Sequence, residues 1–209
     1  MASPEPASPR FTRFVAAERR AERFAGPSEG IPEGTVLDPL IVKREELGRL
    51  APEAAKRAAG LPHSTRRTEV VWVNADSELA VGVTGTRVLT GPAAVLVTLP
   101  VRSDQTGKAE VHVTFAVGEP ERPAGLYAAT QRRPRGPELV VDTWGESIVA
   151  FAWNVVLELI TGLAGAVGKD ARGNRLVPVE LAANVDALFI VPMARHRFSG
   201  STGIGGRDG

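Results

Sequence analysis

Apolar residues occupy every second position between residues 111 and 117, and the positions between them are mostly polar. This period of two is typical of a β-strand with one buried face. A longer apolar run precedes it at residues 94–101, and the polar segment 103–107 between the two contains the Ser, Asp and Gly residues that favour turns. The pattern therefore predicts a β-hairpin made of these two strands.

Shorter apolar runs, separated by turn residues, continue the β pattern on both sides of this hairpin. Successive strands joined by short turns pair antiparallel, because a parallel connection needs about a dozen residues or more. Pro178 and Pro192 favour an edge position or a strand end for the last two strands, since proline donates no backbone hydrogen bond. The further predicted strands lie at residues 70–73, 79–83, 87–90, 125–130, 138–142, 176–181 and 186–193.

Three segments have the pattern of a helix. A short helix is predicted near residues 11–24, and a second at 43–59, where Gly60 is suited to end it in a left-handed conformation. The third and longest is predicted at 143–168. It follows the first group of strands and precedes the last two, so helices and strands are segregated along the chain.

This segregated order predicts an α+β fold, with a curved antiparallel β-sheet of about six to eight strands packed on one long helix in the C-terminal half. Short helices precede the sheet. We expect a flexible N-terminal arm with a short helix at residues 1–42 and a single α+β domain at 43–193. A disordered, basic and Gly-rich tail is expected at 194–209.

The long helix is the most informative segment. Thr143 and Glu146 have the spacing of a capping box at its start. Residues 147–167 are nearly all apolar and would be long enough to span a bilayer. Asn154 and Glu158 near the centre argue against lipid, where an ionisable group is costly. A helix enclosed on three sides by a sheet has the same composition, so we favour it over a membrane span or an obligate helix–helix interface.

Glu158 is the leading candidate for a chemically active residue. Asn154 lies one turn before it on the same narrow polar stripe. In a cavity between helix and sheet, burial would raise the pKa of Glu158 and suit it to general acid–base catalysis. The alternatives are a stripe that faces water and a Glu158 that pairs with an arginine. His112, on the polar side of its strand, is a further candidate as a base or ligand, although a hydrogen-bonded surface histidine is more common.

Composition excludes several kinds of site. The chain has no cysteine, which excludes disulfides, thiolate catalysis and cysteine-ligated zinc. Its three histidines lack the spacing of a metal motif, and no phosphate-binding or dinucleotide-binding motif is present, so we predict neither a metal nor a cofactor. The first ten residues lack the apolar stretch of a secretory signal, which favours a cytoplasmic protein. The preference for Arg over Lys, with abundant Ala, Gly and Pro, indicates a bacterial source.

The net charge of +1 gives no general attraction to nucleic acid or to an anionic membrane. Arginine clusters near residues 19–23, 66–67, 132–135 and 195–197 would grip phosphates only if the fold brought them together. Aromatic residues make up 5% of the chain, which is few for base stacking. The candidate interaction residues, taken mostly from the two ends of the chain, are Phe11, Phe14, Arg132, Arg133, Arg195 and Phe198.

Three functions are compatible with these patterns. The favoured hypothesis is a non-enzymatic interaction or assembly protein that binds a protein partner or forms a homo-oligomer. The second is a small-molecule-binding protein or enzyme whose cavity between sheet and helix is lined by Asn154 and Glu158. The third, which the charge pattern disfavours, is nucleic-acid binding through the arginine clusters.

Overall fold

The fold is α+β, as predicted: the described residues form two five-stranded antiparallel sheets, and one long helix in the C-terminal half packs against both. The computed structural model describes residues 34–36, 38–74, 77–126, 133–167 and 176–195. The predicted helix near residues 11–24 and most of the tail at 194–209 lie outside the described residues. Within them the strands form two sheets, where the sequence pattern predicted one curved sheet.

The larger sheet contains the predicted hairpin. Its strands are β3 (Glu69–Asn74), β4 (Ser77–Gly82), β5 (Arg87–Gly91), β6 (Ala94–Ser103) and β7 (Gly107–Ala116). β6 is the central strand: β7 pairs along its whole length, from Ala94 with Ala116 to Ser103 with Gly107. β4 and β5 both pair with β6, and β3 pairs with β4 at the end of the sheet. The hairpin prediction is therefore confirmed.

The second sheet is built from the two ends of the described chain. It contains β1 (Gly34–Val36), β2 (Leu40–Lys43), β8 (Ala124–Gly125), β9 (Leu176–Ala183) and β10 (Ala187–Arg195). β10 pairs with β9 on one side and with β1 and β2 on the other, and β8 adds to β9. β1 and most of β2 thus lie within the segment expected to be a flexible arm. Their pairing with β10 ties the start of the described chain to its end.

Pro192 shows how this sheet accommodates a proline. β2 pairs with β10 up to Ile190, and β1 pairs with it from Met193 onward. Pro192 therefore falls where the neighbouring strand changes, so its missing N–H costs no ladder hydrogen bond to either strand. On the other side it lies opposite Pro178, next to a register shift after Val191. The gap between β2 and β1 therefore accommodates the proline in the same way as the predicted edge position would, since neither of these strands needs its N–H.

Gly118 joins the two sheets. Its amide donates to the carbonyl of Leu181 at 3.0 Å, and its carbonyl accepts from the amide of Ala183 at 3.0 Å. A Cβ on this glycine would lie 2.4 Å from the carbonyl oxygen of Arg122 and 2.4 Å from the amide nitrogen of Ala124. Because both atoms belong to the backbone, only glycine fits where the hairpin of the larger sheet reaches the second sheet.

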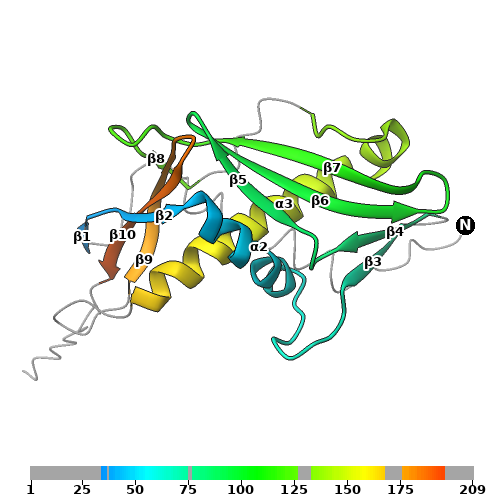
Figure 1. The fold of residues 1–209 in the computed structure, drawn as a ribbon, viewed down its shortest axis with the longest axis horizontal. Coiled ribbons are helices and arrows are strands. Elements are labelled where there is room, and N and C mark those ends of the chain that lie inside the picture. The colour runs from blue at the N-terminus through cyan, green and yellow to red at the C-terminus, as the bar shows by residue number, and fades with distance from the viewer. Residues whose placement is uncertain (1–33, 37, 75–76, 127–132, 168–175, 196–209) are drawn as a thin grey trace, which may run out of the picture.

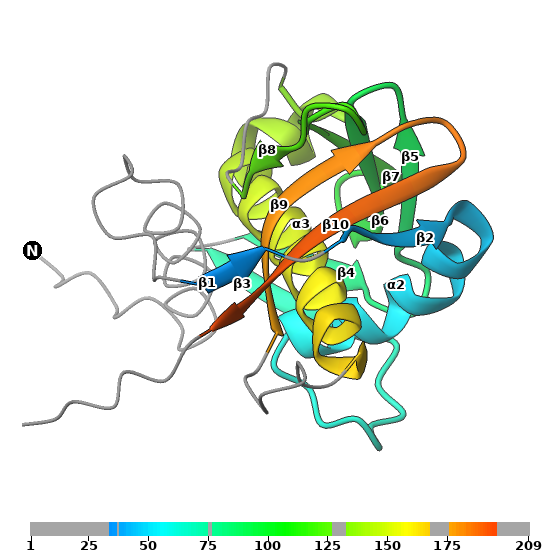
Figure 2. The ribbon, with the colours of Figure 1, turned by 90° about the vertical axis from the view of Figure 1, so that its left-hand side faces the viewer.

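The long helix α3 (Glu138–Val167) lies between the two sheets and beside the second helix, α2 (Arg44–Ala58) (Figure 1). The view of Figure 2 shows β9 and β10 crossing in front of α3, with α2 along its side. Four consecutive residues, from Ala150 to Trp153, are all buried, so the helix is covered around its whole circumference at its centre. By length and composition α3 would be apolar enough to cross a membrane, and half of its most apolar window is buried within the protein.

Two details at the start of α3 correct the sequence analysis. The strand predicted at 138–142 is the first part of the helix, and the capping box at Thr143 and Glu146 falls inside it. The amide of Val141 donates to the carbonyl of Pro137 at 3.0 Å, so the helix begins directly after that proline. Proline is suited to a helix start because its fixed φ is helical and the missing N–H would have no helical partner there. The β-branched residues Val140 and Val141 gave the segment its strand-like composition.

The end of α2 was predicted correctly. Gly60 has a φ of 69°, in the left-handed region. Its amide donates to the carbonyl of Arg57 at 2.8 Å, and the amide of Leu61 donates to the carbonyl of Lys56 at 3.0 Å. These two bonds form a Schellman motif, which pairs carbonyls that the helix itself leaves free.

We predict that Gly118→Ala lowers the free energy of unfolding by about 3 kcal/mol or more, because the added methyl group cannot fit without moving backbone atoms. Chemical denaturation of the purified protein measures the change. Gly91→Ala is the matched control, since a Cβ there meets nothing within 4 Å, and its effect should stay within about 0.5 kcal/mol. Equal effects of the two substitutions would show that the sheets do not meet as described.

Candidate functional site

The polar stripe of α3 faces the C-terminal end of α2. Asn154 donates from Nδ2 to the carbonyl oxygen of Ala58 at 3.3 Å. Arg57 donates from Nη2 to the carbonyl oxygen of Glu158 at 3.2 Å, and its Nε lies 3.4 Å from the Glu158 carboxylate. The side chains of Arg57 and Glu158 are 42% and 39% exposed. The stripe therefore lies at the margin of the contact between the two helices.

This placement gives the stripe a structural role. Ala58 is the last residue of α2, and the carbonyls of the last helical turn have no partner within their own helix. Asn154 supplies a donor to one of them. Glu158 has an arginine partner, which was one of the alternatives raised by the sequence. A Cβ at Gly162 would lie 3.1 Å from Arg57 Nη2, so the glycine leaves room for the guanidinium group over α3.

His112 lies on the outward face of the larger sheet. Its Nδ1 is 3.0 Å from the hydroxyl of Thr98, the residue directly opposite on β6. Its backbone exchanges two hydrogen bonds with Arg135, at 2.8 and 2.9 Å. Arg87 donates to both carboxylate oxygens of Glu110 at 2.9 and 2.8 Å on the same face. His112 is thus oriented by a hydroxyl group, and its ring has no ion pair with a carboxylate in the described part of the chain.

Two of the six predicted interaction residues lie within the described part of the chain. Arg133 forms an ion pair with Asp142 in α3. Arg195 is the last residue of β10, where its backbone lies opposite Gly34. The other four, Phe11, Phe14, Arg132 and Phe198, lie outside the described residues.

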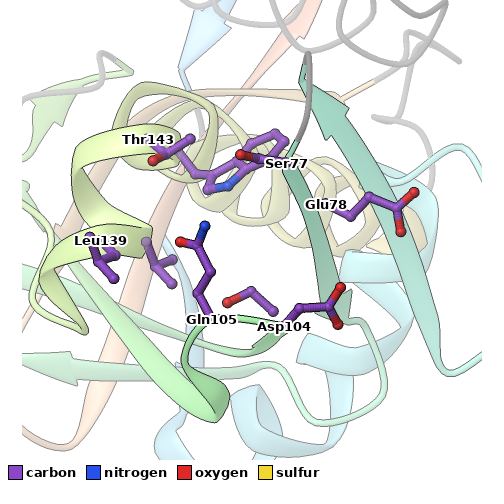
Figure 3. A pocket seen from close by; sticks show the side chains of 9 residues that line it. Ser77, Glu78, Asp104, Gln105, Leu139 and Thr143 are labelled. Carbon is purple, nitrogen blue, oxygen red and sulfur yellow. The ribbon is translucent and has the colours of Figure 1, made fainter.

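A small polar hollow lies where the turn between β6 and β7 approaches the first turns of α3 (Figure 3). Gln105 points from this turn into the space below Thr143 and Ser77, and Glu78 and Asp104 both lie toward the right of this view. The volume of about 60 Å³ holds roughly two water molecules, whereas ligand pockets measure roughly 300 Å³ or more. Among the described residues, no group of three or more acidic or histidine side chains could hold a metal ion.

Comparison with known proteins adds no assignment. No family model, no curated protein and no solved structure matches this chain. The candidate site therefore depends on its own geometry.

The strongest candidate is a surface at β3, an edge strand of the larger sheet. Val70 and Trp72 point inward and are 3% and 7% exposed, whereas Val71 and Val73 point outward and are 43% and 61% exposed. The preceding Arg66 and Arg67 are exposed and line, with the first residues of β3, a shallow groove of about 520 Å³. We call Arg66, Arg67, Val71 and Val73 the β3 patch.

Sequence reasoning found the strand but not this surface. It placed residues 70–73 in one strand without assigning either face of that strand to the core or to solvent, and it named Arg66 and Arg67 only as one of several arginine clusters. The available signal was a strand that is apolar on both faces. Such strands are typical of sheets covered on both sides, whereas the outward face of β3 is exposed at Val71 and Val73.

We predict that Asn154→Ala lowers the free energy of unfolding by about 1 kcal/mol, because the carbonyl of Ala58 loses its donor. Asn154→Asp should cost more at neutral pH, since a carboxylate would then face a carbonyl oxygen at the negative end of α2. Thr161→Ala is the control, because Thr161 lies three residues after Glu158 and so continues the stripe along the helix. Its side chain is exposed, and its loss should change stability by less than about 0.5 kcal/mol. Denaturation curves that were identical for all three variants would contradict the helix-contact role of the stripe.

Proposed function

We propose that this chain is a non-enzymatic interaction or assembly domain of the bacterial cytoplasm, which binds another protein through the β3 patch. The observation that carries the proposal is the outward exposure of Val71 and Val73 on a terminal strand whose inward side chains are buried. An apolar surface rimmed by polar residues on a stable sheet is a common feature of protein-binding sites.

The rim of the patch supports the same function. Glu69, at the start of β3, forms an ion pair with Arg102 of β6 at 3.0 Å. At the other end, Glu78 of β4 lies directly opposite Val73. The two valines therefore lie between charged groups on an ordered strand. A partner that covered them would bury apolar surface on a strand that is paired with β4 along its length.

Burial of the two valines gives a modest driving force. Full burial of a valine side chain contributes about 1.5 kcal/mol or slightly more, and each of these residues is already partly covered. The patch alone therefore supports reversible binding of a segment, while a permanent interface would need additional surface. An accessory domain that engages its partner reversibly fits this scale.

We predict that a photo-cross-linking amino acid at position 73, introduced into the full-length chain in its native cells, forms discrete covalent adducts with protein. Position 114 is the matched control, because Thr114 is also exposed on an outward strand face of the same sheet. An adduct at twice the mass of the chain would identify a second copy as the partner. If adducts at position 73 were no more abundant than adducts at position 114, the proposal would be contradicted.

A further inference from the structure

The charge around the β3 patch is positive at one end. In the described part of the chain, Arg66 and Arg67 form no ion pair. The backbone amide of Arg67 donates to the hydroxyl of Thr65 at 3.3 Å, and neither guanidinium group takes part in this bond. The nearest acidic residue along the chain, Glu69, is already held by Arg102 at 3.0 Å. Two guanidinium groups thus remain available beside the groove.

The opposite end of the patch has the other sign. Glu78 lies across the strand pair from Val73, so the surface changes from basic to apolar to acidic along β3. The distance from Arg67 to Val73 along an extended strand is about 20 Å, which equals the length of a peptide of six or seven residues. Val71 and Val73 are two residues apart, the spacing at which an extended peptide places alternate side chains on one face.

We propose that the β3 patch binds an extended segment of another protein, with acidic residues at the Arg66–Arg67 end and aliphatic residues at alternate positions over Val71 and Val73. This inference rests on the proposed function and specifies the partner. Charge complementarity selects an acidic segment at the arginine end and a neutral or basic residue near Glu78. A nucleic-acid strand would match the arginines alone, because the valines offer no surface on which bases stack.

The test uses fluorescence anisotropy of labelled peptides with the full-length protein. The probe is Glu-Glu-Thr-Val-Thr-Val-Thr-Lys, which places acidic, aliphatic and basic groups in the order that the patch requires. One control peptide replaces the glutamates with lysine, and a second replaces the valines with serine. We expect the probe to bind at least about tenfold more tightly than either control, and its binding to weaken as salt rises from about 50 to about 500 mM.

Protein variants assign the two halves of the site. Arg66→Glu combined with Arg67→Glu should weaken probe binding by about tenfold or more. It should also reverse the salt dependence, because the two attractive charge pairs become repulsive and salt screens that repulsion. Val73→Ser should weaken binding of the probe and leave binding of the serine peptide unchanged. Arg49→Glu is the matched control: this arginine is also exposed, but it lies on α2, and its reversal should leave the affinity unchanged.

The outcomes separate the inference from the function beneath it. Adducts at position 73 together with equal binding of all three peptides would overturn the acidic partner and leave the interaction domain standing. If single-stranded DNA displaced the labelled probe more effectively than the unlabelled probe did, the acidic protein segment would be ruled out in favour of a nucleic acid. Adducts only between copies of the chain, with no probe binding, would make the second copy the occupant. If neither adducts nor probe binding were found, both proposals would be overturned.

Discussion

The whole structure depends on the burial of α3. Apart from the narrow stripe that contains Asn154 and Glu158, α3 is apolar around its circumference, and such a helix is stable in water only if other parts of the chain cover its apolar sides. Trp153, Phe151, Ile148 and Ile160 are each 2% exposed or less. On one side the ring of Trp153 lies 5.0 Å from that of Phe115 in β7, and on another Phe151 meets Trp72 of β3 at 5.5 Å, edge to face. Each such side chain contributes about 1.5–3 kcal/mol when it is fully buried.

The requirement for cover explains features that are otherwise unrelated. One sheet cannot surround a helix, so a second sheet closes the other side, and Gly118 joins the two where any side chain would collide with backbone. α2 covers a further side of α3, and the backbone carbonyls in the last turn of α2 need hydrogen-bond donors from outside that helix. Asn154 and Arg57 provide hydrogen bonds at that contact. The polar stripe of α3 therefore lies at the contact between the two helices, where Asn154 and Glu158 both have structural partners on α2.

Local signals in the sequence predicted local structure well. The hairpin of β6 and β7 followed from strict alternation around a polar turn, and Gly60 followed from its position after a helical segment. The start of α3 was predicted wrongly, because Val140 and Val141 resemble a strand and the helix-starting property of Pro137 outweighs them. The division into two sheets depends on contacts between distant segments, such as Gly118 with Ala182, and no local pattern encodes that pairing.

The candidate site shows the same division. The sequence identified Asn154, Glu158 and His112 as unusual because of their residue types, but their partners are distant in the chain: Ala58, Arg57 and Thr98. The β3 patch was missed because its distinguishing property is position at the end of a sheet. Val71 and Val73 differ from Val70 only in the face of the strand from which they project, and which face is covered depends on tertiary structure.

Native-state hydrogen exchange of the α3 backbone amides, in aqueous buffer without detergent, tests the central claim most directly. If the helix is enclosed as described, the amides of residues 150–160 exchange only through global unfolding, and their opening free energies equal the stability measured by denaturant. Exchange of these amides at rates far above global unfolding, or a chain that stays in solution only with detergent, would contradict a helix enclosed by its own two sheets and α2.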